Sequence, residues 1–158
     1  MDLSGTRLNG DCFGLVDTNI LLRITRRFDP QHQMVDTALA RLAGHGTTLY
    51  YTHQNIAELW NAMTKPVERN GLGLSAAETE REVLAIEAGM SLLPDNEAVY
   101  REWRKIVVSH HVSGVQVHDA RLAAAMYVHG VSHLLTLNVT DFSRFDGLTA
   151  LHPDSVKA

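Results

Sequence analysis

The stretch Leu15-Val16-Asp17-Thr18-Asn19 decides how the fold of this chain is interpreted. An apolar run stops there at a carboxylate, an alcohol and an amide, and the chain is apolar again immediately afterwards. Short continuous apolar runs are typical of buried parallel strands, and open α/β sheets bind ligands at the carboxyl ends of such strands. Asp17 is therefore a candidate functional residue, and the alternative is that it only caps the following helix.

Length and composition favour one globular domain. The chain has 158 residues and a mass of 17.5 kDa, with 45% hydrophobic and 20% charged residues, which is ordinary for a globular protein. We expect a single domain over 1–158, in which 1–11 form a polar lead-in. No apolar run is long enough to cross a bilayer and the first residues lack the features of a signal peptide, so we expect a cytoplasmic protein with no membrane partner.

Charge and metal-ligating residues exclude several classes of protein. The net charge of −4 and the pI of about 6.1 are unlike those of a basic nucleic-acid-binding domain, although a cation bound by carboxylates would offset local negative charge. The single Cys12 excludes an intramolecular disulfide and a thiolate zinc cluster, and we expect it to pack beside the first strand. The nine His residues include no His-Glu-x-x-His motif, so a zinc protease is excluded as well.

Strand and helix patterns alternate along the chain. Apolar runs predict strands over 12–16, 47–51, 90–93 and 133–137, with an edge strand over 148–151. Helical periodicity predicts helices over 19–28, 33–43, 54–65, 76–89, 95–110 and 119–129. Thr52 and Ser75 are predicted N-caps, Glu78 completes a capping box with Ser75, and Gly130 is a predicted C-cap. This alternation predicts a parallel sheet that helices cover on both faces.

Four acidic side chains lie at the ends of predicted strands or on the helices beside them. Asp17 and Asp141 follow apolar strands, whereas Glu58 and Asp119 lie on or at the start of helices that flank the sheet. An exposed surface position for Glu58 and a helix-capping role for Asp119 are the plain alternatives. Carboxylates that lie close together oppose joint ionisation, so such clusters normally bind hard cations. An oxygen-only ligand set suits Mg²⁺ or Mn²⁺ better than Zn²⁺.

A group of arginines follows the first strand at helical spacing. Arg23, Arg26 and Arg27 lie one helix away from Asp17. They form either a solvated face of that helix or contacts with the phosphate backbone of a nucleic acid.

Four motifs in order resemble the PIN-domain family, and within it the VapC-like ribonuclease toxins of type II toxin–antitoxin pairs. The motifs are Val16-Asp17-Thr18-Asn19, Asn55-Ile56-Ala57-Glu58-Leu59, His118-Asp119-Ala120-Arg121-Leu122 and Thr136-Leu137-Asn138-Val139-Thr140-Asp141-Phe142. The resemblance covers 13–153. It implies a Rossmann-like α/β/α sandwich with a Mg²⁺- or Mn²⁺-dependent endoribonuclease site, in which Asp17, Glu58 and Asp119 are the central acids.

The fourth acidic position departs from one common form of the family. Many members have an acid two residues after the strand-end Thr, where this chain has Asn138, while others have Asn there and an Asp before the Phe. We assign the fourth role to Asp141 and a supporting role to Asn138. Thr18, Asn19 and Thr136 are candidates for holding the carboxylates or water through hydrogen bonds.

The expected activity is hydrolysis of RNA phosphodiester bonds by metal-bound water, which needs no His general base and no Ser or Cys nucleophile. The resemblance also implies a toxin that a cognate antitoxin inhibits, and a homodimer. A PIN-like module that binds RNA or a protein without cutting is the alternative, and Asn138 is its one hint. Phosphotransfer through an aspartyl intermediate is disfavoured because Asp17-Thr18-Asn19 lacks the second Asp of the dehalogenase-type motif.

Overall fold

The computed structural model describes residues 13–158, so the predictions for Cys12 and for the lead-in 1–11 lie outside the described part. Five parallel strands form the central sheet in the order β3-β2-β1-β4-β5. The strands are β1 (Phe13–Val16), β2 (Thr48–Tyr51), β3 (Ser91–Leu92), β4 (His133–Leu135) and β5 (Thr149–Leu151). The predicted α/β sandwich with a central parallel sheet is confirmed.

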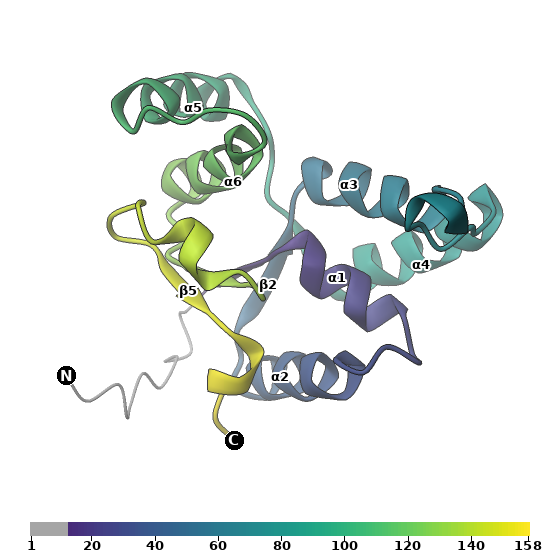
Figure 1. The fold of residues 1–158 in the computed structure, drawn as a ribbon. Coiled ribbons are helices and arrows are strands. Elements are labelled where there is room, and N and C mark those ends of the chain that lie inside the picture. The colour runs from purple at the N-terminus through teal and green to yellow at the C-terminus, as the bar shows by residue number, and fades with distance from the viewer. Residues whose placement is uncertain (1–12) are drawn as a thin grey trace.

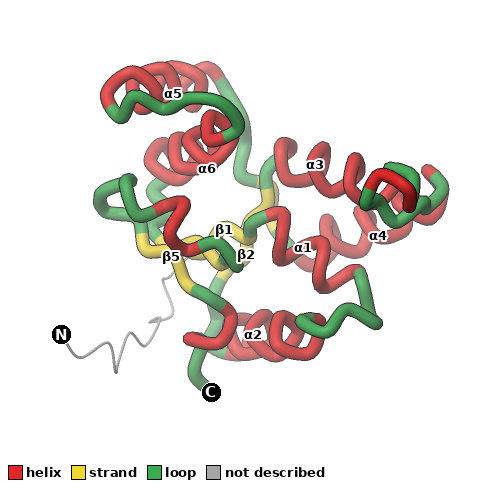
Figure 2. The backbone as a smooth tube through the Cα atoms, viewed as in Figure 1, coloured by secondary structure: helices red, strands yellow, loops and turns green. Residues whose placement is uncertain are grey.

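Helices cover both faces of this sheet. They are α1 (Thr18–Thr25), α2 (His32–Gly44), α3 (His53–Thr64), α4 (Ala76–Gly89), α5 (Glu97–Ser109) and α6 (Gln116–His129). Figure 1 and Figure 2 show α5 and α6 together on one side of the sheet and α1, α2, α3 and α4 on the other. The chain moves from β1 to β2 to β3 and then returns to β4, and right-handed crossovers in opposite directions place their helices on opposite faces.

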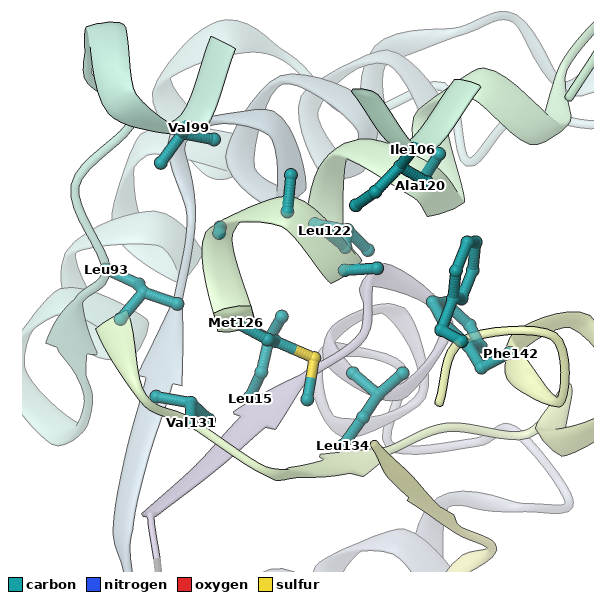
Figure 3. Close-up of a cluster of buried hydrophobic side chains, with 14 residues drawn as sticks. Leu15, Leu93, Val99, Ile106, Ala120, Leu122, Met126, Val131, Leu134 and Phe142 are labelled. Atoms are coloured by element: carbon teal, nitrogen blue, oxygen red, sulfur yellow. The ribbon is translucent and has the colours of Figure 1, made fainter. Parts of the chain in front are cut away.

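Alternate residues of the strands point into two separate cores. Leu15 and Leu134 pack against α5 and α6, whereas Val16 and Leu135 pack against the helices of the other face. Figure 3 shows Leu15 and Leu134 directed toward Met126 of α6. Since strands buried on both faces carry apolar residues at every position, these runs are continuous rather than alternating.

The helix ends differ from prediction at two places that concern the site. α1 ends at Thr25 rather than at 28, because Arg26 leaves helical geometry and Asp29 accepts a hydrogen bond from the backbone N–H of Gln31 in a turn. α6 begins at Gln116, so Asp119 lies inside the first turn rather than at the cap. The predicted N-caps Thr52 and Ser75 and the Ser75–Glu78 capping box are confirmed.

Three short 3₁₀ helices complete the described chain: η1 (Val67–Arg69), η2 (Val139–Phe142) and η3 (Pro153–Ser155). The predicted strand over 133–137 is shorter than expected, because β4 ends at Leu135 and the chain then turns toward η2. Among residues 13–158, no helix has both the length and the apolar character that crossing a membrane requires.

Candidate active site

The carboxyl ends of β1 and β4 meet at the point where the strand order reverses. β1 pairs with β2 on one side and with β4 on the other, so the connections leaving β1 and β4 diverge. The register pairs Val16 with Leu135, and the residues that follow are Asp17 and Thr136. Ligands of open α/β sheets bind in the crevice at such a switch point.

Asp17 is held by hydrogen bonds at this position. Its Oδ1 accepts from the backbone N–H of Thr18 at 2.7 Å, and its Oδ2 accepts from the hydroxyl of Thr136 at 2.8 Å. Its side chain is the N-cap of α1, and the residue is 8% exposed. Capping and a place in the site are therefore compatible, because Oδ1 accepts only the hydrogen bond from Thr18 and keeps a free lone pair.

Asn19 links the ends of the two strands. Its Nδ2 donates to the hydroxyl of Thr136 at 3.3 Å and, more distantly, to Oδ2 of Asp17 at 3.4 Å. Its Oδ1 accepts from the backbone N–H of Leu137 at 3.2 Å. The first turn of α1 is thus joined to the chain that leaves β4.

Thr18 connects α1 to Glu58 of α3. Its hydroxyl donates to Oε2 of Glu58 at 2.7 Å and accepts from Nδ2 of the fully buried Asn55 at 3.0 Å. Glu58 is half-buried rather than out in solvent, and Gln54 donates to its Oε1 at 2.8 Å. Both oxygens of Glu58 therefore have fixed directions.

Gln54 extends the network to α6. Its Nε2 donates to the backbone carbonyl of His118 at 3.0 Å as well as to Glu58, so one amide joins α3 to the residue before Asp119. The Oε1 atom of Gln54 is buried without a hydrogen-bond partner. An unpaired buried acceptor is costly, and here two bonds from the opposite end of the amide offset that cost.

Asn138 and Asp141 lie in the segment after β4. The backbone N–H of Asn138 donates to the hydroxyl of Thr136 at 3.0 Å, and its side chain makes no capping hydrogen bond to η2. Asp141 is on η2 and exposed. Its charge nevertheless acts on both Asp17 and Asp119.

All four predicted acids take part in the pKa shifts of Asp17 and Asp119. The pKa of Asp119 is raised to about 6, mainly by burial and also by the charges of Asp17, Asp141 and Glu58, while Arg144 opposes them. Burial is also the largest cause that raises the pKa of Asp17; hydrogen bonds from Thr136 and Thr18 lower it, and the charges of Glu58 and Asp141 add to the increase. The structure thus brings Asp17, Glu58, Asp119 and Asp141 within one another's electric field.

The donor chemistry of these residues fits a hard divalent cation, because it consists of carboxylate oxygens whose mutual repulsion a cation would relieve. Within 13–158, however, no three His, Cys, Asp or Glu side chains already converge in a way that could hold a metal ion.

The predicted arginine group contacts Asp29 and none of the four acids of the site. Arg23 and Arg26 both pair with Asp29, with N–O distances of 3.6 and 3.7 Å, and Arg27 is exposed in the turn after α1. None of the three is among the charges that shift the pKa of Asp17 or Asp119. The solvated-face interpretation is sufficient for their observed contacts.

The sequence predicted no role for Gln54, Asn55 or Arg144, although Asn55 stands in one of the four motifs. A signal existed for Gln54, because it lies one helical turn before Glu58 and so on the same face of α3. Arg144 follows a 3₁₀ turn, and no periodic pattern predicts the direction of a side chain there.

Comparison with known proteins agrees with this architecture. The family model of the PIN domain matches residues 14–148. No curated protein matches the chain by sequence. VapBC2 from Rickettsia felis, solved bound to a promoter DNA fragment, has a similar structure, with a TM-score of 0.65 and 14% identity over 89% of this chain and 98% of that one.

Two further solved structures have the same fold. FitAcB from Neisseria gonorrhoeae has a TM-score of 0.60 and 18% identity, covering 90% of this chain and 99% of that one. VapC20 from Mycobacterium tuberculosis, described as a toxin that cleaves the sarcin–ricin loop, has a TM-score of 0.57 and 15% identity, covering 77% of this chain and 86% of that one. At these identities the likeness concerns the fold. Because the family model spans nearly the whole described chain, the protein belongs to the PIN domain family.

Proposed function

We propose that this protein is a metal-dependent endoribonuclease that hydrolyses RNA phosphodiester bonds and acts as the toxin of a toxin–antitoxin pair. The observation that carries the proposal is the group of four carboxylates at the switch point of the sheet, whose charges act on one another. PIN domain toxins of the VapC type are nucleases, which supports the same class of reaction.

In this proposal Asp17, Glu58, Asp119 and Asp141 are the ligands of Mg²⁺ or Mn²⁺. A bound divalent cation would lower the pKa of a water molecule and stabilise the charge that develops on the phosphate. Thr18 orients Glu58 through its hydroxyl, and its backbone N–H orients Asp17.

The remaining site residues hold the ligands in place. Thr136 donates to Asp17, Asn19 bridges the two strand ends, and Asn138 donates to Thr136 through its backbone. Arg23, Arg26 and Arg27 are proposed contacts for the RNA backbone away from the scissile bond.

The proposed partners follow from the structural neighbours. VapBC2 and FitAcB are toxin–antitoxin assemblies, and a structure titled as a toxin–antitoxin complex from Klebsiella pneumoniae is also similar, with a TM-score of 0.61. We therefore propose that a cognate antitoxin binds this chain and that the chain forms a homodimer. Expression of the chain alone should arrest growth, and co-expression of its antitoxin should restore growth.

Asp17→Asn tests the proposed chemistry with little disturbance of the fold. Asn caps helices as well as Asp does, and its one side-chain oxygen can keep the hydrogen bond from Thr18, although its amide nitrogen would then face the hydroxyl of Thr136. It has no charge with which to bind a cation. RNA cleavage by the purified variant should fall by at least about 100-fold, since even residues that only orient metal ligands are worth 10- to 100-fold. Asp36→Asn, at an exposed position on α2, is the matched control and should cleave RNA normally. Full activity of Asp17→Asn would contradict the proposal.

A further inference from the structure

Within residues 13–158, no carboxylate forms an ion pair with the cationic side chain of Arg144. Its guanidinium donates at 2.7 Å to Oε1 of Gln116, which is a neutral acceptor. Five basic residues of the described chain pair with acids: Arg23 and Arg26 with Asp29, Arg101 with Glu97, Lys105 with Glu102, and Arg121 with Asp95. Arg144, like Arg41 and Arg104, instead donates to a neutral acceptor. The positive charge of Arg144 is therefore still available to an anion.

This charge lies near Asp119, whose pKa it lowers. Gln116 is the first residue of α6, three positions before Asp119, and Arg144 follows Asp141 of η2 by three positions. Phe142 of η2 packs in the same core as α6, which keeps these two segments together. Arg144 is half-buried, and its positive charge opposes the increase in the pKa of Asp119.

An RNA strand that enters this site must bring a phosphodiester anion toward four carboxylates. A guanidinium that is already oriented reduces this repulsion, and its planar set of N–H donors matches two phosphate oxygens. Gln116 occupies one of five donors, so the others remain for a ligand. Because Gln116 already orients the guanidinium, the side chain loses less conformational entropy when it binds a ligand.

We propose that Arg144, oriented by Gln116, binds a non-bridging phosphate oxygen of the RNA strand beside the four acids. This inference rests on the proposed nuclease function and assigns a substrate contact beside the four acids, in addition to the predicted arginine group at the end of α1.

The test measures binding of a single-stranded oligoribonucleotide by fluorescence anisotropy over a range of KCl concentrations, in the Asp17→Asn background so that the RNA stays intact. Arg144→Gln should weaken binding about ten-fold, the value of a charge-assisted hydrogen bond. It should also reduce the slope of log K against log salt by about 0.7, the value of one phosphate contact on a single strand. A purely structural role for Arg144 would leave that slope unchanged.

Arg144→Lys and Gln116→Leu refine the result. Arg144→Lys should keep the salt slope because it keeps the charge, but it should lose part of the affinity because it lacks the planar fork. Gln116→Leu should weaken binding with the slope retained, since the cation is present but no longer held. Arg81→Gln on the exposed surface of α4 is the matched control and should bind RNA as the background does.

An unchanged slope and affinity in Arg144→Gln would overturn the assignment, whether or not the wild-type protein cleaves RNA. If the wild-type protein cleaves RNA in that case, the proposed nuclease function stands and only the phosphate contact is wrong. A wild-type protein that neither binds nor cleaves RNA would overturn both.

Discussion

Thr18 makes three hydrogen bonds in the site. Its backbone N–H donates to Asp17, and its hydroxyl both donates to Glu58 and accepts from Asn55. One small side chain therefore couples the end of β1 to α3. The sequence suggested Thr18 as a support because it follows Asp17, but its bond to Glu58 joins residues 40 positions apart, which no local pattern encodes.

Thr18→Val should destabilise the protein. Valine has nearly the shape of threonine but no hydroxyl, so the buried Nδ2 of Asn55 would lose its acceptor. The free energy of unfolding should fall by about 1–3 kcal/mol, measured by urea denaturation. Thr149→Val, at an exposed position on β5, is the control and should change stability little. Equal stability of Thr18→Val and the wild type would show that this network does not hold the site.

Gln54→Leu should weaken binding of Mn²⁺ without unfolding the protein. Leucine removes the two bonds from Nε2 and also the buried acceptor that lacks a partner, so the cost to stability is partly offset. We expect the affinity for Mn²⁺, measured by calorimetric titration, to fall about ten-fold because Glu58 is no longer oriented.

The matched control is Gln33→Leu on α2, where the glutamine is exposed. It should bind Mn²⁺ as the wild-type protein does. Unaltered affinity of Gln54→Leu would mean that Gln54 does not position Glu58.

At the scale of elements, the apolar runs predicted the strands well and the helix ends less well. Asp17 and Thr136 were expected at strand ends, and register places them side by side. The start of α6 was set at 119 because Asp is a common cap, whereas the helix begins at Gln116 without any side-chain cap. A helix that begins without a capping side chain has no sequence signal at its start. The sequence therefore predicted neither Gln116 as the first residue of α6 nor its contact with Arg144.

The end of α6 offers a clean test of an element boundary. Gly130 has a φ of 68°, and a Cβ added there would meet nothing within 4 Å, so only backbone strain opposes a side chain. Gly130→Ala should therefore cost about 1–2 kcal/mol in unfolding free energy. Gly89→Ala at the end of α4 has equal space and no positive φ, and it should be neutral or stabilising. Equal effects of the two substitutions would contradict this account of the α6 end.

At the scale of the whole molecule, two apolar cores fix the strands at whose carboxyl ends the four acids lie; this end of the sheet is called the acidic edge. Leu15 and Leu134 belong to one core, and Val16 and Leu135 to the other, so the strands that end at the site are fixed from both faces. The alternation of strands and helices was enough to predict this sandwich. The mutual approach of Glu58, Asp119 and Asp141 was not predictable from spacing alone, because it depends on crossovers between distant segments.

The acidic edge should make stability depend on pH in the cation-free protein. The pKa of Asp119 is raised from 3.8 to about 6 and that of Asp17 is also raised, so the folded state holds protons that the unfolded state has released. Stability should therefore be highest below pH 3.8 as far as Asp119 is concerned, and it should fall as the pH rises through about 6.

Since Asp119 is only half-buried, the loss should be on the order of 1 kcal/mol after solvent screening. Urea denaturation at several pH values in chelator measures it, and Asp119→Asn should flatten the profile between pH 4 and about 6. An Asp119→Asn profile identical to that of the wild type would contradict this account of the acidic edge.

Cleavage of RNA by the wild-type protein, followed in excess chelator and again after Mn²⁺ is added back, tests the central claim most directly. The four-acid site predicts no cleavage in chelator and recovery of cleavage with Mn²⁺, because the cation that Asp17, Glu58, Asp119 and Asp141 would hold is what lowers the pKa of the attacking water and stabilises the charge on the phosphate. Equal cleavage in chelator and in Mn²⁺ would contradict it.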